Sequence, residues 1–192
     1  IGSLRWLLAV SLYFTAISAT ASDILGPPLE SSPTVVNIGF YLSEISAISE
    51  EDETLEFEGI LSLSWRDPRQ AFDPQEAGYD EKFFQGNYQF SEVFNGWWPQ
   101  IILANESGKY ERQGVMLRIA PDGLITYIEE IDAIAEARMD LRRFPFDQQK
   151  LYAMFEVLGF DKDVVVLRTD PSTSGTWDDE HHRVHVPQWG PP

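Results

Sequence analysis

The clearest pattern of apolar and polar positions lies in the segment Leu55–Trp65, where the two kinds of side chain alternate. Leucine, phenylalanine, glycine and tryptophan occupy its odd positions, and glutamate and serine fill most of the even ones. A period of two predicts a strand with one face in the core. The preceding segment, Val35–Ile48, is apolar and β-branched, and the acidic run Glu50–Glu53 separates the two. We therefore expect a β-hairpin with an acidic turn.

A second hairpin is predicted around Pro121-Asp122-Gly123, because glycine adopts a positive φ there without steric cost. Gly114–Ala120 and Leu124–Ile131 flank this turn as strands, whereas Arg66–Tyr88 is rich in loop residues and has room for one short helix. Short strands separated by Gly, Pro and Asp turns predict an all-β fold, an antiparallel β-sandwich. Further strands are expected at Trp97–Ala104, Ala133–Leu141, Lys150–Val157, Val164–Leu167 and Trp177–Val186.

The first 21 residues differ from the rest of the chain. A single charge, Arg5, precedes an apolar run and the small residues Ser18–Ala21, which is the order of a secretory signal peptide. A retained membrane anchor is the alternative, but the apolar run is shorter than the ~20 residues that a bilayer span needs. We expect residues 1–21 to be a signal peptide, residues 22–34 an extended lead-in and residues 35–192 one exported β-sandwich.

Composition narrows the classes of function. The chain has 192 residues, with 14 Lys+Arg against 31 Asp+Glu and a formal net charge of −17. An acidic protein repels the phosphate backbone, so a nucleic-acid partner is excluded. The chain has no cysteine, which excludes disulfides, thiolate nucleophiles and Cys-ligated zinc.

Several motifs occur in a characteristic order along the body of the chain. They are Leu63–Asp67 (LSWRD), Trp97-Trp98-Pro99, Asn105 and Phe144–Gln149 (FPFDQQ). Together they resemble the extracellular ligand-binding domain of pentameric ligand-gated ion channels, the Cys-loop receptor superfamily. The FPFDQQ segment is the most specific of these motifs, and the resemblance spans about residues 33–187.

Three other features make the chain most similar to the bacterial proton-gated members: Val36–Gly39, Ala71–Pro74 and the Pro121–Gly123 hairpin. In animal members two cysteines bracket the FPFD loop. Ala137 and Leu151 stand at those positions here, so the resemblance implies a loop without a disulfide.

The resemblance also implies an assembly and a location. It predicts an immunoglobulin-like β-sandwich that forms a homopentamer, is not an enzyme, and senses an agonist or protons for a cation channel. The domain would face the periplasm or cell exterior at the bacterial inner membrane. Family members continue into a capping loop, a last strand and four membrane helices, and we expect these, with the membrane attachment, beyond Pro192.

In this family the agonist binds between neighbouring subunits, so the resemblance implies a site with two faces. One face would include Asn105 and Glu106, after the Trp-x-Pro motif, and Glu156 and Phe160, after the FPFD loop. The matched positions offer few aromatic rings, which argues against a quaternary-amine agonist. The other face would include Ile60, Ser62, Arg118 and residues near Met116.

Protons are the alternative trigger, because carboxylates crowded around a fivefold axis disfavour one another's ionisation. Glu50, Glu51 and Asp52 form the strongest acidic cluster, and the resemblance places Arg142 and Arg143 beside it as partners. A solvated surface turn is the competing interpretation. The implied coupling loop consists of Phe144, Pro145, Phe146 and Asp147.

We expect no cofactor. Binding of a divalent cation is an alternative, because the chain has clustered acids and a histidine-rich segment. His181 and His185 share one face of the predicted last strand and are weak candidate metal ligands, with a solvated strand edge as the alternative. Asp161–Asp163 and Asp178–Glu180 are clustered acids, but no stretch matches a Ca²⁺-binding loop.

Two other functions compete with a channel domain. A secreted, channel-free homologue would bind a ligand without transducing a signal. A carboxylate-based hydrolase or a carbohydrate-binding sandwich is a minor alternative, but the sequence has no nucleophile motif such as Gly-x-Ser-x-Gly.

Overall fold

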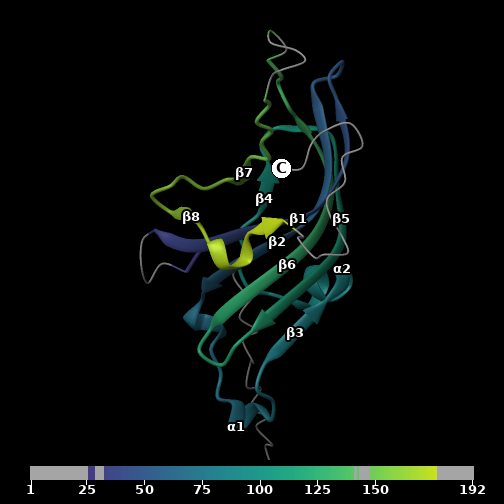
Figure 1. The fold of residues 1–192 in the computed structure, drawn as a ribbon. Coiled ribbons are helices and arrows are strands. Elements are labelled where there is room, and N and C mark those ends of the chain that lie inside the picture. Colours follow the sequence, from purple (N-terminus) through teal and green to yellow (C-terminus); the bar gives the residue numbers. More distant parts are fainter. Residues whose placement is uncertain (1–25, 29–32, 141, 143–147, 177–192) are drawn as a thin grey trace, which may run out of the picture.

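The computed structural model describes residues 26–28, 33–140, 142 and 148–176. Within them the chain forms a β-sandwich in which a small sheet packs against one face of a large one (Figure 1). The all-β prediction is therefore confirmed. The predicted signal peptide, most of the lead-in and the predicted strand Trp177–Val186 lie outside the described residues.

The large sheet has the strand order β3-β5-β6-β2-β1-β8, with β9 also beside β1. Its strands are β1 (Thr34–Ser49), β2 (Thr54–Arg66), β3 (Lys82–Gln85), β5 (Glu106–Ile119), β6 (Leu124–Glu136), β8 (Val165–Thr169) and β9 (Gly175–Thr176). The small sheet pairs β4 (Ile101–Leu103) with β7 (Phe155–Val157). The pairing is antiparallel as predicted, except that β8 and β9 run parallel to β1.

Short helical turns connect the strands: η1 (Pro68–Gln70), α1 (Pro74–Ala77), α2 (Gly86–Tyr88), η2 (Gln89–Val93) and η4 (Pro171–Thr173). Three of them begin with an aspartate followed by a proline, and Asp67, Asp73 and Asp170 each accept a hydrogen bond from the backbone N–H two residues later. Aspartate caps a helix and proline suits its first position, so these dipeptides specify the turns. Across the described ranges, no helix is long and apolar enough to cross a membrane.

Both predicted hairpins are confirmed. β1 and β2 pair on either side of residues 50–53, and β5 and β6 pair around the Pro121–Gly123 turn. Gly123 has a φ of 78°, and a Cβ at this position would lie 2.6 Å from the backbone oxygen of Asp67. Glycine is therefore required at Gly123 by both its backbone angle and this close approach. Figure 1 places the β1–β2 turn at one end of the molecule and α1 at the other.

Several strand boundaries differ from the sequence prediction. β5 begins at Glu106 rather than at Gly114, and β4 covers only Ile101–Leu103 of the predicted Trp97–Ala104. β3 lies within the stretch predicted to be rich in loops, and the strands predicted at Leu124–Ile131 and Ala133–Leu141 form one continuous strand, β6.

β6 ends at Glu136 rather than at Leu141, and β7 begins at Phe155 rather than at Lys150. β8 extends to Thr169, two residues beyond the predicted end. The segments 137–140 and 148–154 are thus irregular. Ala137, Met139, Leu151 and Ala153 still pack in the core, whereas Tyr152 and Met154 are exposed.

The core lies between the two sheets and contains two tryptophans. Trp65 and Trp97 are 1% and 6% exposed, and their rings meet edge to face with centroids 5.9 Å apart. A second cluster, centred on Phe57 and Ile131, fills the end nearer the β1–β2 turn. This confirms that the alternating positions of β2 form the buried face.

Candidate functional site

Glu129 is a carboxylate in a core position of β6. The alternation of this strand turns Ile125, Tyr127, Glu129 and Ile131 toward the interior. Glu129 is only 3% exposed, like its apolar neighbours. A buried carboxylate is costly unless hydrogen bonds and an opposite charge compensate it. The side chains around Glu129 therefore define a polar site inside the sandwich.

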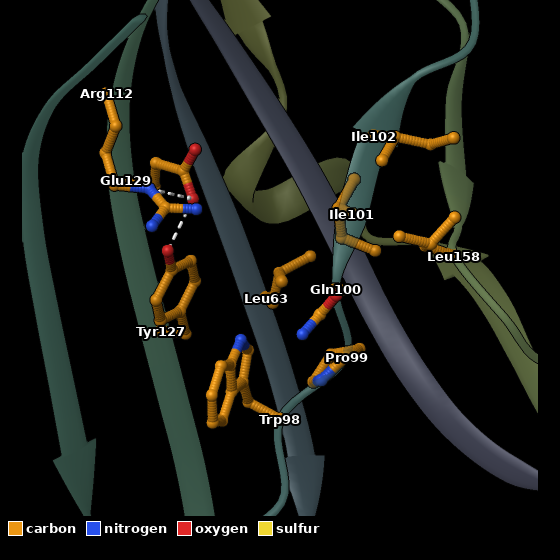
Figure 2. Close-up of a pocket in the computed structure, with 10 residues that line it drawn as sticks. All are labelled: Leu63, Trp98, Pro99, Gln100, Ile101, Ile102, Arg112, Tyr127, Glu129 and Leu158. Atoms are coloured by element: carbon orange, nitrogen blue, oxygen red, sulfur yellow. Dashed lines mark hydrogen bonds and ion pairs between the residues drawn. The ribbon is translucent and has the colours of Figure 1, made fainter. Parts of the chain in front are cut away.

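Three side chains compensate Glu129, and Figure 2 shows two of them. Tyr110 Oη donates a hydrogen bond to Oε1 over 2.8 Å, and Tyr127 Oη donates to Oε2. Arg112 Nε lies 3.3 Å from Oε2 as an ion pair. The Arg112 side chain is 40% exposed, so this pair joins the buried carboxylate to the surface.

A bulge in β5 brings Tyr110 and Arg112 to this site. Arg112 pairs with Ile131, a core position of β6, whereas Gly114 pairs with an outward position. The additional residue between them, Gln113, reverses the alternation of the strand. In a regular strand Tyr110 and Arg112 would face away from the core.

The charge of Glu129 also affects its partners. Burial raises the pKa of Tyr110 and Tyr127, and the negative charge of Glu129 raises both further. Glu106 acts on Tyr110 in the same direction. Burial lowers the pKa of Arg112, but Glu129 and the tyrosines outweigh this effect and the pKa is raised overall. Two neutral donors and one cation therefore face Glu129 across the physiological pH range.

This polar site forms one wall of a cavity of about 200 Å³ (Figure 2). The opposite wall is the segment Trp98–Ile102, which leads into β4, and Leu63 and Leu158 complete the lining. Apolar walls with a few convergent polar groups are typical of small-molecule sites. The cavity is smaller than the ~300–1,000 Å³ pockets that hold drug-sized ligands, so it suits only a small guest.

Residues 23–189 match the protein family described as the neurotransmitter-gated ion-channel ligand binding domain. The chain belongs to this family. The resemblance expected from the LSWRD, Trp-x-Pro and FPFDQQ motifs is thus confirmed, and the family consists of ligand-gated ion channels rather than enzymes.

Known members of the ligand-binding domain family include bacterial and animal proteins. The chain is 34% identical, over 80% of its length, to a proton-gated ion channel from Gloeobacter violaceus. It is 27% identical over 69% of its length to the acetylcholine receptor subunit beta from Xenopus laevis, and 29% identical over 74% to the gamma-aminobutyric acid receptor subunit beta-4 from Gallus gallus. The chain spans 41%, 26% and 29% of the lengths of these three relatives.

The sequence-predicted ligand contacts of this domain fall on two separate parts of the fold. Ile60 and Ser62 are half-buried on the face of the large sheet that points away from the core. Arg118 lies on the same face of β5, where its guanidinium is 3.7 Å from a carboxylate oxygen of Glu81. Their role in binding an agonist stays a prediction.

The other four predicted ligand contacts lie near β4 and β7. Glu106 and Glu156 are exposed, and Phe160 is 38% exposed with its ring edge-on to Trp97 at a centroid distance of 6.2 Å. Asn105 is buried, and its side-chain amide makes three hydrogen bonds to backbone groups. The amide of Asn105 is thus occupied within the domain, and the roles of Glu106, Glu156 and Phe160 in binding an agonist stay predictions.

The predicted gating residues are described in part. Glu50, Glu51 and Asp52 are exposed, and Asp52 accepts a hydrogen bond from the Ser49 hydroxyl over 2.9 Å. The predicted pairing of Arg142 with this acidic turn is wrong, because Arg142 pairs with Asp140, two residues away. A local carboxylate satisfies the guanidinium without long-range contact. Arg143, Phe144, Pro145, Phe146 and Asp147 lie outside the described residues.

A metal site has no support in the described part of the chain. There, no group of three or more histidine, aspartate or glutamate side chains could hold an ion. Asp161 and Asp163 are exposed on a turn before β8. His181, His185 and the acids at 178–180 lie outside the described residues.

The Arg142–Asp140 pair leads to a prediction about the pKa of Asp140. Hydrogen bonds from the Arg142 side chain and then its backbone lower the pKa of Asp140 to about 2. We expect Arg142→Gln to raise the pKa of Asp140 toward the ordinary aspartate value, as measured by carboxyl NMR titration. Because the folded pKa is depressed, the stability from this pair is present above the ordinary value and lost as pH falls toward 2.

Asp170 serves as the internal control in this titration. Its pKa is lowered by the Ser172 hydroxyl and backbone rather than by an arginine. Arg142→Gln should therefore leave Asp170 unchanged. A parallel shift of both carboxyls would contradict a local origin of the Asp140 value.

Proposed function

We propose that this domain is the extracellular, periplasm-facing sensor of a homopentameric, proton-gated cation channel, and that Glu129 is one place where a proton acts. The observation that carries this proposal is the buried Glu129 carboxylate, balanced by Arg112 at the wall of a cavity. The relative named as a proton-gated ion channel supports the choice of protons.

A proton on Glu129 would change the balance of charge at this cavity. The groups that face the carboxylate are Tyr110 and Arg112 from β5 and Tyr127 from β6. A neutral carboxyl no longer attracts the Arg112 guanidinium, whose side chain already reaches solvent. Arg112 is then free to leave the carboxyl, which alters the wall that faces the Trp98–Ile102 segment. Such a local change of charge can bias a receptor that has two conformations.

An agonist that binds between subunits is compatible with this mechanism. We propose Ile60, Ser62 and Arg118 on one subunit, and Glu106, Glu156 and Phe160 on its neighbour, as the lining of that site. Their positions on separate parts of the fold favour two contributing copies.

The proposal is tested in the full-length protein by electrophysiology with pH steps. Glutamine resembles a protonated glutamate, so Glu129→Gln should move the pH of half-activation upward by about 0.5 unit or more. Glu130→Gln is the matched control, because Glu130 is the exposed neighbour on the same strand. The double variant Glu50→Gln, Glu51→Gln tests the acidic turn in the same assay.

The outcomes separate the possibilities. An unchanged activation curve for Glu129→Gln would remove Glu129 from the mechanism. A full-length protein that conducts only with an organic agonist would overturn the proton proposal. A protein that assembles without conducting would favour the channel-free binding homologue.

A further inference from the structure

Two side-chain amides lie where the strand β6 ends and the strand β7 begins. β6 ends at Glu136 and β7 begins at Phe155, and no strand continues either of them through the described residues in between. Backbone groups in these irregular segments still require partners. Gln149 and Asn105 supply several of them, beside the backbone bonds from Ala137 N–H to Glu53 C=O and from Ala104 N–H to Met154 C=O.

Gln149 pairs with both backbone groups of a single residue. Its Oε1 accepts a hydrogen bond from Asp140 N–H, and its Nε2 donates one to Asp140 C=O, each over 3.0 Å. A primary amide carries a donor and an acceptor side by side, so it reproduces the two-bond exchange of a hydrogen-bonded strand pair. This pair bridges nine positions in the sequence.

Asp140 is held from its other side as well. Its carboxylate accepts hydrogen bonds from the backbone N–H and the Nε of Arg142, at 3.3 and 2.7 Å. Backbone and side chain of Asp140 therefore both have hydrogen-bond partners, and because the Arg142–Asp140 pair is exposed, the bonds to Gln149 carry most of the restraint.

Asn105 also links the two segments, at positions nearer to the end of β6 and the start of β7. Its Nδ2 donates to Glu136 C=O over 2.9 Å and to Tyr152 C=O over 2.8 Å, and its Oδ1 accepts from Met154 N–H over 2.9 Å. Asn105 therefore joins the end of β6 to the segment that leads into β7.

We propose that Gln149 and Asn105 form an amide clamp, a positioning device that holds the chain entering and leaving the segment 141–148 together without a covalent link. The chain has no cysteine to do this. The clamp fixes the end of β6 against the start of β7 and so sets how the large sheet and the small sheet meet. It acts independently of whether the channel responds to protons.

Hydrogen–deuterium exchange of the full-length protein tests the clamp at the peptide that contains Asp140. Gln149→Leu removes both bonds to Asp140 and should lower the protection factor of that peptide about tenfold. Gln148→Leu is the matched control, because Gln148 is an exposed glutamine next to it, and it should change protection less than twofold.

Gln149→Glu tests whether the hydrogen bonds matter. If the side chain at position 149 only filled space, the protection of Asp140 in this variant would not depend on pH. An ionised glutamate accepts a hydrogen bond from Asp140 N–H but cannot donate to its C=O, whereas a protonated one can do both. Loss of the bond to Asp140 C=O should therefore lower protection at Asp140 below wild type at pH 7, though less than Gln149→Leu does, and protection should rise toward the wild-type value at pH 4, relative to the intrinsic exchange rate at each pH. Protection that does not respond to pH in this variant would overturn the clamp.

A disulfide offers a rescue. Ala137 and Leu151 belong to the same apolar cluster, on the two segments that the clamp joins. Adding Ala137→Cys and Leu151→Cys to Gln149→Leu should restore protection at the end of β6 and the start of β7 under oxidising conditions and lose it again on reduction, whereas the Asp140 N–H, which still lacks its acceptor, should stay unprotected. The proposal fails if Gln149→Leu leaves Asp140 protected, or if it lowers protection equally in all strands of the large sheet.

Discussion

Replacing Trp65 by alanine should lower the free energy of unfolding by about 3–5 kcal/mol, the largest effect that we expect from one substitution. Trp65 is 1% exposed and lies at the centre of the main core cluster, edge to face with Trp97. Alanine would leave a cavity between the two sheets that Trp97 and the other core side chains cannot fill. Urea unfolding followed by circular dichroism measures the loss without depending on tryptophan fluorescence.

Trp65→Phe is the control for this experiment. Trp65 Nε1 has no hydrogen-bond partner in the described part of the chain, so phenylalanine loses volume but no hydrogen bond seen there. We expect a cost of about 1–2 kcal/mol. Equal costs for the two substitutions would show that the indole does not fill the core in the way described.

Removing the Glu129 carboxylate should be the second-largest effect. We expect Glu129→Ala to lower the free energy of unfolding by about 2–3 kcal/mol, less than for a fully buried pair, because Arg112 is partly exposed. The substitution leaves the hydroxyls of Tyr110 and Tyr127 without their acceptor in an apolar interior. The same urea titration measures it.

Glu130→Ala separates this effect from a general loss of charge. Glu130 is exposed one position further along β6, and its replacement should change stability by no more than about 0.5 kcal/mol. Glu129→Gln should fall between wild type and Glu129→Ala, because an amide still accepts one tyrosine hydroxyl. A Glu129→Ala variant as stable as Glu130→Ala would contradict the account of a compensated buried charge.

The sequence predicts the strands well where one rule dominates. In β2 every second side chain is apolar, and the structure buries those positions from Leu55 to Trp65. The Pro121–Gly123 turn is equally explicit, because the chain needs a positive φ at Gly123. In both places local chemistry and tertiary packing agree, so the pattern alone is sufficient.

The Glu129 site was only partly visible in the sequence. Glu129 occupies an apolar register between Tyr127 and Ile131, and an acid in such a position signals a buried charge with a partner. The partner could not be identified, because the bulge at Gln113 decides which face of β5 carries Arg112. No residue type marks that bulge.

The boundaries of β6 and β7 were misjudged for a different reason. The apolar residues of Ala133–Leu141 and Lys150–Val157 suggest strands. Alternate ones do pack in the core, among them Ala137, Met139, Leu151 and Ala153, whereas Tyr152 and Met154 are exposed. Between Glu136 and Phe155 the backbone instead has scattered partners, which are backbone groups of Glu53 and Ala104 and the side-chain amides of Asn105 and Gln149. Hydrophobic periodicity reports burial and carries no information about such amide partners.

The parallel strands beside β1 have a consequence for biosynthesis. Among the described strands, β1 leaves the ribosome first, yet β8 and β9 must lie against it, and the hydrogen bond from Phe40 N–H to Ser174 spans 134 positions. Until β8 and β9 are made, one edge of β1 presents unpaired backbone groups that can recruit other chains. We therefore expect nascent chains that stop before Val165 to aggregate or to require a chaperone.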